Sequence, residues 1–361
     1  MMHRLSEFPL PLRRKIGVVL FVVIGLLPFV FDTITVLRMT GALYLATFAM
    51  TWDFQSGYTG EISFGHAFFF AVGGYTSGIM NLHYGLDPVL AIPIGMVAAT
   101  LGGLLLGIPT LRVHGPYLSL VTMAAPLILL QVFIYFSDFT GGEVGLTGTE
   151  NITSEPMVNY YIAFALFAAM FALFYAITRS DTGEILTAIR EDEDAVVAAG
   201  INPAKYKIYS FVLSGTVGGL AGALLVHSNV GSATPGQLLE LSVNINIITA
   251  TVIGGMGTII GAAGGGIFFF MLREQLANVG TTIPTTDVAI SHIDLVLFYS
   301  MAVLIMFYQP QGFIPWLIER GRKLIGADEE SVSDENDSPL RQSMDKLRNG
   351  FQDAFNRGGE K

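Results

Sequence analysis

The sequence predicts an all-α protein, a polytopic transmembrane helix bundle of about eight to ten spans with broken or re-entrant Gly-rich segments. Three observations lead to this fold class. Hydrophobic residues make up 52% of the 361 residues and charged residues only 13%, whereas about a quarter of the residues in an ordinary soluble protein are charged. Basic residues are absent from 39–111, and Arg273 is the only one in 208–319. Both gaps contain apolar segments long enough to cross a bilayer.

The individual spans follow from length and hydropathy, because a helix needs about 20 mostly apolar residues to cross the hydrocarbon core. Suitable segments lie near residues 16–31, 35–52, 62–80, 88–109, 116–136, 160–178, 208–228 and 294–310. A Gly-rich block at 243–277 is too long for one helix and short for two. Its centre, "GGMGTIIGAAGGG", predicts a tight hairpin or a broken helix, which a membrane protein tolerates only where the backbone is buried in protein or lines a cavity.

Basic residues predict the topology, because they concentrate on the cytoplasmic side. Basic clusters at 13–15, 179–207 and 320–323 place both termini and one long loop in the cytoplasm. If both termini are inside, the number of crossings is even. It is ten if the Gly-rich block counts as two crossings, and eight if some segments are re-entrant. The resulting domains are a cytoplasmic N-terminal lead, a transmembrane domain with its cytoplasmic loop, and an acidic cytoplasmic tail in which we expect an amphipathic helix. The lead is residues 1–15 and the transmembrane domain is 16–312, with its loop at 179–207. The tail is 313–361, with its amphipathic helix at 338–356.

Several kinds of chemistry are missing. The sequence contains no Gly-Lys dipeptide, which excludes the phosphate-binding loop G-x-x-x-x-G-K-[ST], so we expect no ATP hydrolysis by this chain alone. His66 and His227 have no Glu or His at metal-site spacing, and no G-x-S-x-G motif occurs. We therefore expect no enzyme activity, metal site or cofactor.

An ion-coupled carrier is also disfavoured. Such carriers keep charged groups deep in the bilayer, where they persist only for function. Here the charged residues near apolar segments lie at or near predicted helix ends, where interfacial anchoring explains them; they are Glu61, Arg273, Glu274 and Asp294. A protein without an energy source of its own then needs one from elsewhere.

Glycines four residues apart are the most frequent pattern. They put two small residues on one helix face, which lets backbones approach closely. The pairs are 74/78, 103/107, 215/219, 218/222 and 257/261. The pattern predicts a tightly packed bundle.

The loop at 179–207, "RSDTGEILTAIREDEDAVVAAGINPAKYK", is the most charged stretch of the hydrophobic region. It predicts an amphipathic helix whose apolar residues face away from its acids. The apolar set is Ile185, Ile189, Val196 and Val197, and the acidic set is Glu184, Glu191 and Asp192. Gly200 then breaks the helix, and Asn202-Pro203 caps and begins the next. A solvated connector would also have this composition, but the arrangement suits a docking element.

Five stretches together resemble the permease subunits of branched-chain amino-acid ABC transporters, in order and approximate spacing. The match is closer to the M-type permease and covers about residues 35–312. The stretches are "GYTGEISFGHAFFFAVGGYT" (57–76), "GPYLSLVTMAAPLILLQVF" (115–133), "TGGEVGLTG" (140–148), "RSDTGEILTAIREDEDAVVAAGINPAKYKIYSFVLSGTVGGLAGAL" (179–224) and "TATVIGGMGTIIGAAGGGIFF" (249–269).

The resemblance implies an importer of the cytoplasmic membrane, in which this permease pairs with a related sister permease. Two cytoplasmic ATP-binding cassette subunits supply energy and an extracytoplasmic binding protein delivers substrate; membrane lipid surrounds the complex, and no nucleic-acid partner is expected. In the coupling motif of ABC permeases an acid-Ala pair precedes a glycine. Asp194, Ala195 and Gly200 occupy those positions, with Asp where Glu is common. We add Glu184, Arg190 and Glu193 as further coupling residues.

The substrate path is expected where glycines interrupt the spans. Gly57, Gly60 and Gly65 interrupt one, and Gly254, Gly255 and Gly257 interrupt the Gly-rich block, which repeats the same plan and hints at internal duplication. Broken helix ends present backbone dipoles, which can meet the ammonium and carboxylate of an amino acid without placing a permanent charge in the protein. The expected path side chains are Tyr58, Ser63, His66 and Asn246.

Two alternatives stay open at this point. A stand-alone secondary carrier or channel for a small polar solute would need no partner, although the expected intramembrane ion site is missing. Within the same family, a permease for urea or short-chain amides has the same sequence features, because the binding protein largely sets specificity in such systems.

Overall fold

The computed structural model describes residues 12–113, 115–277 and 312–324, together with Val296, Tyr299, Ser300, Ala302, Val303, Leu304 and Phe307. The amphipathic helix expected at 338–356 and most of the expected span at 294–310 lie outside the described residues. The chain divides after Ile314 into two units. In the described part of the second unit, which contains most of α15 (Phe313–Leu324), the guanidinium of Arg320 lies over the ring of Trp316.

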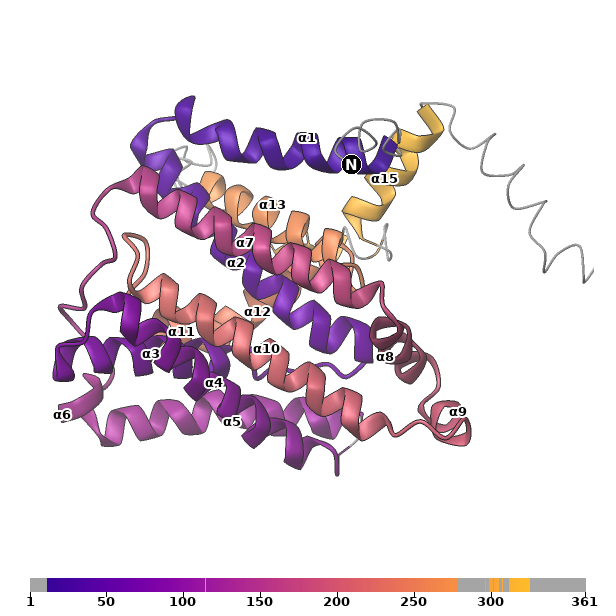
Figure 1. The fold of residues 1–361 in the computed structure, drawn as a ribbon, viewed down its shortest axis with the longest axis horizontal. Helices are drawn as coiled ribbons and strands as arrows, with labels where there is room; N and C mark the ends of the chain where they lie inside the picture. The colour runs from indigo at the N-terminus through magenta and orange to yellow at the C-terminus, as the bar shows by residue number, and fades with distance from the viewer. Residues whose placement is uncertain are drawn as a thin grey trace, which may run out of the picture. The chain divides into compact units, whose positions relative to one another are not determined.

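The described secondary structure is helical apart from a single antiparallel bridge between Leu146 and Ala233 (Figure 1). A 3-10 turn (Leu27–Phe29) follows α1, and a π turn (Asp53–Gly57) follows α2. The helices of the first unit are α1 (Leu12–Leu26), α2 (Thr33–Trp52), α3 (His66–Tyr84), α4 (Pro88–Thr110), α5 (Pro116–Tyr135), α6 (Ser137–Thr140), α7 (Pro156–Thr178), α8 (Asp181–Glu191), α9 (Glu193–Ala198), α10 (Pro203–Val226), α11 (Pro235–Leu238), α12 (Leu241–Gly254) and α13 (Ile259–Ala277).

Seven helical segments among the described residues are long and apolar enough to cross a membrane, which confirms the predicted all-α transmembrane bundle. They are Thr33–Gly57, Pro88–Thr110, Pro116–Tyr135, Pro156–Thr178, Pro203–Val226, Pro235–Gly254 and Ile259–Leu276. Neither α1 nor α3, also expected to span, is among them. The apolar segment Val19–Phe29, which runs from α1 into the 3-10 turn, is shorter, so the number of crossings stays a prediction.

Local features of the sequence explain three helix boundaries. The span expected from 62 begins at His66, because the chain around Gly60 (φ 76°) is irregular. The span expected from 208 begins at Pro203, where the Asn202 side chain caps the helix by accepting a hydrogen bond from the Ala204 N–H at 3.1 Å. The Gly-rich block at 243–277 forms two helices separated at 255–258, as the broken-helix prediction requires.

Helices α3, α4 and α10 pack through glycines, which confirms part of the spacing pattern. A Cβ atom on Gly215 would lie 2.9 Å from the Ala99 carbonyl oxygen, and one on Gly103 would lie 2.8 Å from that of Phe211. A Cβ atom on Gly219 would overlap Ala99. Only glycine therefore permits these backbones to approach so closely. The contact between Gly73 and Gly95 belongs to the same interface and was not predicted, because these glycines lie outside the marked pairs.

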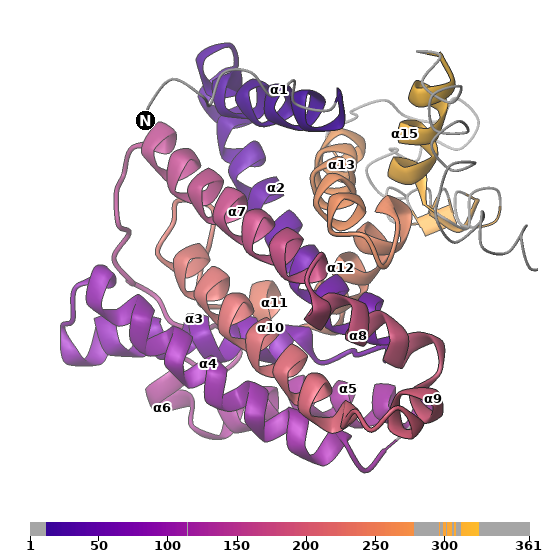
Figure 2. The ribbon, with the colours of Figure 1, turned by 45° about the vertical axis from the view of Figure 1, so that its right-hand side comes forward.

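Helix α2 packs against α7, α12 and α13 (Figures 1 and 2). A Cβ atom on Gly266 would overlap the backbone of Ala46, so α13 lies directly against α2. On another side of α2, the ring of Phe48 stacks on that of Phe70, with centroids 3.7 Å apart. Nearly every residue from Ala42 to Gly57 is buried, so α2 is a central helix of this unit.

The two ends of the bundle are built differently. Helices α8 and α9 lie at one end, and α6 lies at the other (Figures 1 and 2). At the α6 end, the polar loop before α7 is joined to the chain after α10: the Leu146 N–H donates to the Ala233 carbonyl at 2.9 Å, and the Ile152 N–H donates to the His227 carbonyl at 2.9 Å. The polar loop before α7 is therefore held in place by backbone hydrogen bonds.

Candidate functional site

The two Gly-rich breaks touch each other. The fully buried Asp53, at the start of the π turn after α2, accepts a hydrogen bond from the Gly257 N–H at 2.6 Å. A Cβ atom on Gly57 would lie 2.8 Å from that same nitrogen. Gly257 has φ 78°, a left-handed conformation that side chains other than glycine adopt at a cost. We name residues 53–65 the first break and residues 255–258 the second break.

Arg190 of α8 lies on both breaks. Its Nη1 group donates a hydrogen bond to the Gly57 carbonyl oxygen at 3.0 Å. A Cβ atom on Gly60 would lie 2.7 Å from Arg190 Cγ, and one on Gly257 would lie 2.6 Å from Nη1. The absence of side chains at these glycines thus creates the space that the arginine occupies.

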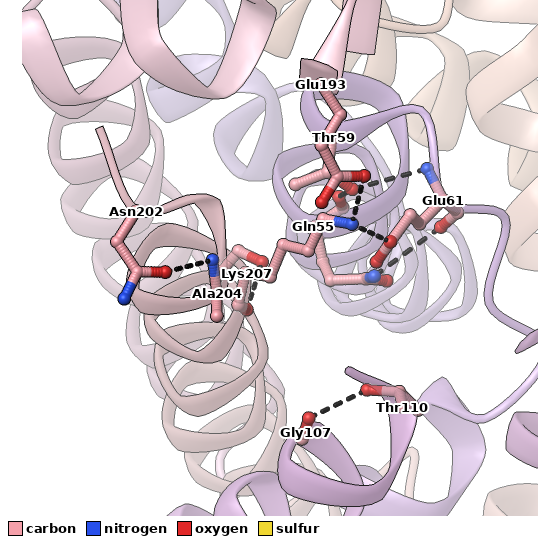
Figure 3. A network of polar contacts seen from close by, with 10 residues as sticks. Gln55, Thr59, Glu61, Gly107, Thr110, Glu193, Asn202, Ala204 and Lys207 are labelled. Carbon is pink, nitrogen blue, oxygen red and sulfur yellow. Dashed lines mark hydrogen bonds and ion pairs between the residues drawn. The ribbon is translucent and has the colours of Figure 1, made fainter. Parts of the chain in front are cut away.

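Lys207, near the start of α10, forms the centre of an ionic network (Figure 3). Its ammonium group lies 2.6 Å from Glu61 Oε1 in the first break and 2.8 Å from Glu193 Oε2 at the start of α9. Only 6% of the Lys207 side chain is exposed. Because a buried ammonium is costly unless paired, these three residues depend on one another. We name Glu61, Glu193 and Lys207 the ionic triad.

The first break is further held by its own polar groups, also drawn in Figure 3. The Glu61 N–H donates to Thr59 Oγ1 at 3.3 Å, and Gln55 Nε2 donates to the Glu61 carbonyl at 3.5 Å. The backbone around Glu61 is therefore shaped locally, and its carboxylate is directed to α9 and α10 by the ionic triad.

The predicted coupling residues fall into two groups. Arg190 and Glu193 contact the first break or its partners, as described above. The other four are exposed; they are Glu184, Asp194, Ala195 and Gly200. The structure thus places one group toward the bundle and leaves the other accessible at the α8–α9 end.

The loop itself differs from expectation in one respect. Two helices replace the single one, because Asp192 adopts an extended conformation and its side chain accepts a hydrogen bond from the Ala195 N–H at 3.0 Å, capping α9. Of the predicted apolar face, Ile189 and Val196 are buried but Val197 is 54% exposed, because the cap at Asp192 changes the helical register. Gly200 ends the segment with φ 81°, as predicted.

Three of the four predicted path residues lie in or beside the first break. Ser63 is buried and accepts a hydrogen bond from the Gly65 N–H at 3.1 Å, while its carbonyl accepts one from Trp52 Nε1 at 2.7 Å. The buried ring of His66, at the start of α3, meets Phe69 and Phe70 edge-on. Tyr58 is partly buried and packs against the core.

Asn246 lies elsewhere. It is on α12, where its Oδ1 accepts a hydrogen bond from the Tyr299 hydroxyl at 2.8 Å, and it lines a cavity of about 560 Å³. The cavity is formed by α2, α12 and α13 together with the ends of α10 and α11, toward the α6 end of the bundle. The structure therefore does not bring the four path residues together. This cavity was not predicted from the sequence, because its residues Arg273 and Glu274 were interpreted as interfacial anchors near a helix end.

A family described as "Branched-chain amino acid transport system / permease component" matches residues 34–307. The high-affinity branched-chain amino acid transport system permease protein LivM of Escherichia coli (strain K12) is 25% identical over 289 residues, covering 72% of this chain and 65% of that protein. The probable branched-chain amino acid transport permease protein LivM of Methanocaldococcus jannaschii is 23% identical over 325 residues, covering 78% and 92%.

A relative named for another cargo is similar over a shorter region. The fructose import permease protein FrcC of Rhizobium meliloti is 27% identical over 240 residues, covering 63% of this chain and 65% of that protein. The chain thus spans slightly less than two thirds of the length of the E. coli and R. meliloti proteins.

Proposed function

Because the chain belongs to the branched-chain amino acid transport permease family, and is thus a transport subunit rather than an ATPase, we propose that it carries branched-chain amino acids inward across the cytoplasmic membrane as part of an ABC importer. The two LivM relatives support this cargo. The similarity to a fructose permease makes a sugar the competing cargo, and urea or a short amide is the alternative within the family.

The contact between α8 and the first break is the observation that carries this proposal. ATPase subunits bind the exposed group Glu184, Asp194, Ala195 and Gly200, and their movement reaches the membrane helices through Arg190 and the ionic triad. Since Arg190 touches both breaks, a displacement of α8 changes the contact between them. The ends of α2, α3, α12 and α13 then move relative to one another.

The proposed assembly contains a sister permease, two ATP-binding cassette subunits and an extracytoplasmic binding protein. The basic residues of the 179–207 loop support a cytoplasmic location for α8 and α9, and both termini are then cytoplasmic. With this orientation, the first break with its residues Tyr58 and Ser63, and His66 at the start of α3, form the inner end of the path. Asn246 and its cavity belong to the outer half.

Co-purification with the neighbouring gene products tests the proposal. The complex is placed in lipid discs, and ATPase activity is measured with and without the binding protein loaded with leucine, fructose, ribose or urea. We expect a stable complex that leucine-loaded binding protein stimulates. Stimulation by a sugar or urea alone would overturn the cargo, and a chain that carries solute in liposomes without any ATPase would overturn the importer in favour of a stand-alone carrier.

A further inference from the structure

We propose that α15 lies on an anionic lipid surface, the cytoplasmic leaflet of the membrane, and that its first residues transmit this contact to the second break. The inference rests on the proposed function, which places this end of the bundle in the cytoplasm. It adds lipid as a regulator of coupling, by a route that does not pass through Arg190. The route consists of Gly312, Phe313 and Ile314, which we name the C-terminal link.

The C-terminal link packs against the second break. Gly312 is buried, and a Cβ atom on it would overlap the Cα atom of Gly255 and lie 2.5 Å from the Gly255 nitrogen. Its φ of 88° is the left-handed conformation that glycine adopts without strain. Asp53 and Arg190 lie against Gly257 in the same break. Two separate parts of the chain therefore contact the second break.

The rest of the C-terminal link packs on α13, the helix that follows the second break. The rings of Phe313 and Phe268 stack with centroids 5.7 Å apart. A Cβ atom on Gly264 would lie 3.1 Å from Ile314 Cδ1, so the absence of a side chain there leaves room for the isoleucine. Phe313 and Ile314 belong to the first unit and are also the first two residues of α15. Because α15 is one continuous helix, a partner that binds its later residues can displace the link.

The sequence of α15, "FIPWLIERGRKL", is amphipathic. The apolar positions 313, 317 and 324 recur at helical spacing, and so do the charged positions 319, 322 and 323, which fall on the opposite face. On the apolar face, Leu317 is 50% exposed. A helix with one apolar and one basic face is typical of helices that lie in the plane of a membrane surface.

The charge of α15 favours anionic lipid. Its segment "ERGRK" has three basic residues and one acid. Arg320 is exposed, and its guanidinium lies 5.9 Å from the centroid of the Trp316 ring. Tryptophan is enriched at membrane interfaces, and basic residues are attracted to anionic headgroups. A membrane surface meets both faces at once, because acyl chains contact the apolar face and headgroups the basic one. A protein docked on one face would leave the other uncovered.

This contact has a consequence for coupling. When α8 moves, Arg190 changes the contact between the two breaks only if the second break does not move with it. Anionic lipid that holds α15 also holds Gly312 on Gly255 and so anchors the second break. We therefore expect loaded binding protein to stimulate ATPase activity more strongly in anionic membranes than in neutral ones.

Fluorescence quenching tests the lipid contact. The chain has no cysteine, so Leu317→Cys gives this subunit a single thiol for a fluorophore in a complex with cysteine-free partners. Val197→Cys is the matched control, because Val197 is 54% exposed and lies on α9. The discs contain phosphatidylcholine alone or an equal mixture with phosphatidylglycerol, with brominated acyl chains that quench only within the apolar layer. We expect quenching at 317 in the anionic discs and none at 197.

Arg320→Gln and Lys205→Gln separate α15 from other basic residues. Both residues are exposed, and each cation lies 5.9 Å from the centroid of an aromatic ring. In the anionic discs, Arg320→Gln should lower the ratio of quenched to unquenched fluorophore about fivefold, the contribution of one basic residue at an anionic surface. Lys205→Gln should leave this ratio unchanged.

Gly312→Ala tests the transmission, because its Cβ atom would displace the link from Gly255. Quenching at 317 should persist, whereas phosphatidylglycerol should no longer increase the stimulated ATPase activity. Ile314→Ala is the milder variant if Gly312→Ala does not fold. It removes the contact at Gly264 and should reduce the effect of phosphatidylglycerol without changing the quenching.

Several results would overturn the inference. One is a fluorophore at 317 that is not quenched in anionic discs, or that is quenched equally at 197. Crosslinking of position 317 to an ATPase subunit would identify a protein as the occupant instead of lipid. Stimulated activity that does not depend on lipid charge, despite quenching at 317, would refute the transmission and leave the proposed function intact. A complex that lacks ATPase subunits would contradict the proposed function, and quenching at 317 would still decide the lipid contact.

Discussion

Arg190 and Gly57, 133 positions apart in the chain, are joined by a hydrogen bond of 3.0 Å from the guanidinium Nη1 to the carbonyl oxygen. The carbonyl belongs to the π turn after α2, and the arginine belongs to the short helix α8 outside the spans. This bond and the ionic triad connect the 179–207 loop to the first break.

Replacing Arg190 should uncouple ATPase activity from transport. Arg190→Ala removes a charge-assisted hydrogen bond and the side chain that fills the space over Gly60 and Gly257, so we expect leucine transport per ATP hydrolysed to fall about tenfold. The complex should still assemble. The matched control is Arg179→Ala, because the Arg179 guanidinium lies over the Tyr175 ring at the same end. Equal losses in both variants would contradict a specific role for Arg190.

Removing Lys207 should destabilise the fold. Lys207→Met leaves Glu61 and Glu193 facing each other without their cation, and we expect a loss of about 3 kcal/mol in the free energy of unfolding, seen as a lower Tm in detergent. Adding Glu61→Gln and Glu193→Gln to Lys207→Met should recover most of this loss, because no unpaired charge remains. A triple variant less stable than the single one would show that the network is not primarily electrostatic.

Gly257→Ala should impair the coupling of ATPase activity to transport, in addition to destabilising the backbone at this position. The left-handed conformation alone costs about 1–2 kcal/mol for alanine, and the new Cβ atom would also lie 2.6 Å from Arg190 Nη1 and displace it. Gly85→Ala is the control, since Gly85 has φ 64° and open space where its Cβ would be. Both variants should lose similar stability, measured as Tm, and only Gly257→Ala should reduce stimulated ATPase activity. Equal activity in the two would count against the Arg190 contact.

Stability should fall as the pH drops below about 6.5 because of His227. Burial of its ring, after the end of α10, lowers the pKa of His227 below its usual 6.5, although nearby carbonyl and acidic groups oppose this. The unfolded chain therefore binds a proton at a higher pH than the folded chain does. The stability that the neutral ring contributes is present above pH 6.5 and lost as the pH falls toward the lowered folded-state pKa.

A Tm series between pH 7.5 and 5.5 measures this effect. His227→Gln should be less stable at pH 7.5, because it lacks the contact of 2.6 Å between His227 Nδ1 and the Glu150 carbonyl oxygen, but it should lose less stability on acidification. Parallel Tm curves for the two proteins would show that another group controls the pH dependence.

The sequence by itself determined the all-α membrane fold, the break at 255–258 and the start of α10. These features depend on local properties: hydropathy over about 20 residues, glycine clusters and a capping Asn-Pro pair. It also identified Arg190 and Glu193 as coupling residues, a role that stays a prediction. Local composition could not show that α8 and α9 are separated by the Asp192 cap, because a single acidic residue in an acidic loop is not distinctive.

Only the tertiary structure decided which distant groups meet. Asp53 and Gly257 are 204 positions apart, and Lys207 reaches acids on two different segments, because helix packing brings those segments together. The same packing puts Ser63 and His66 at one end of the central helices and Asn246 in the cavity between α2, α12 and α13. No periodicity in the sequence indicates which end of one helix lies beside which end of another. That relation depends on the contacts of glycine backbones and buried rings across α2, α3, α10 and α13.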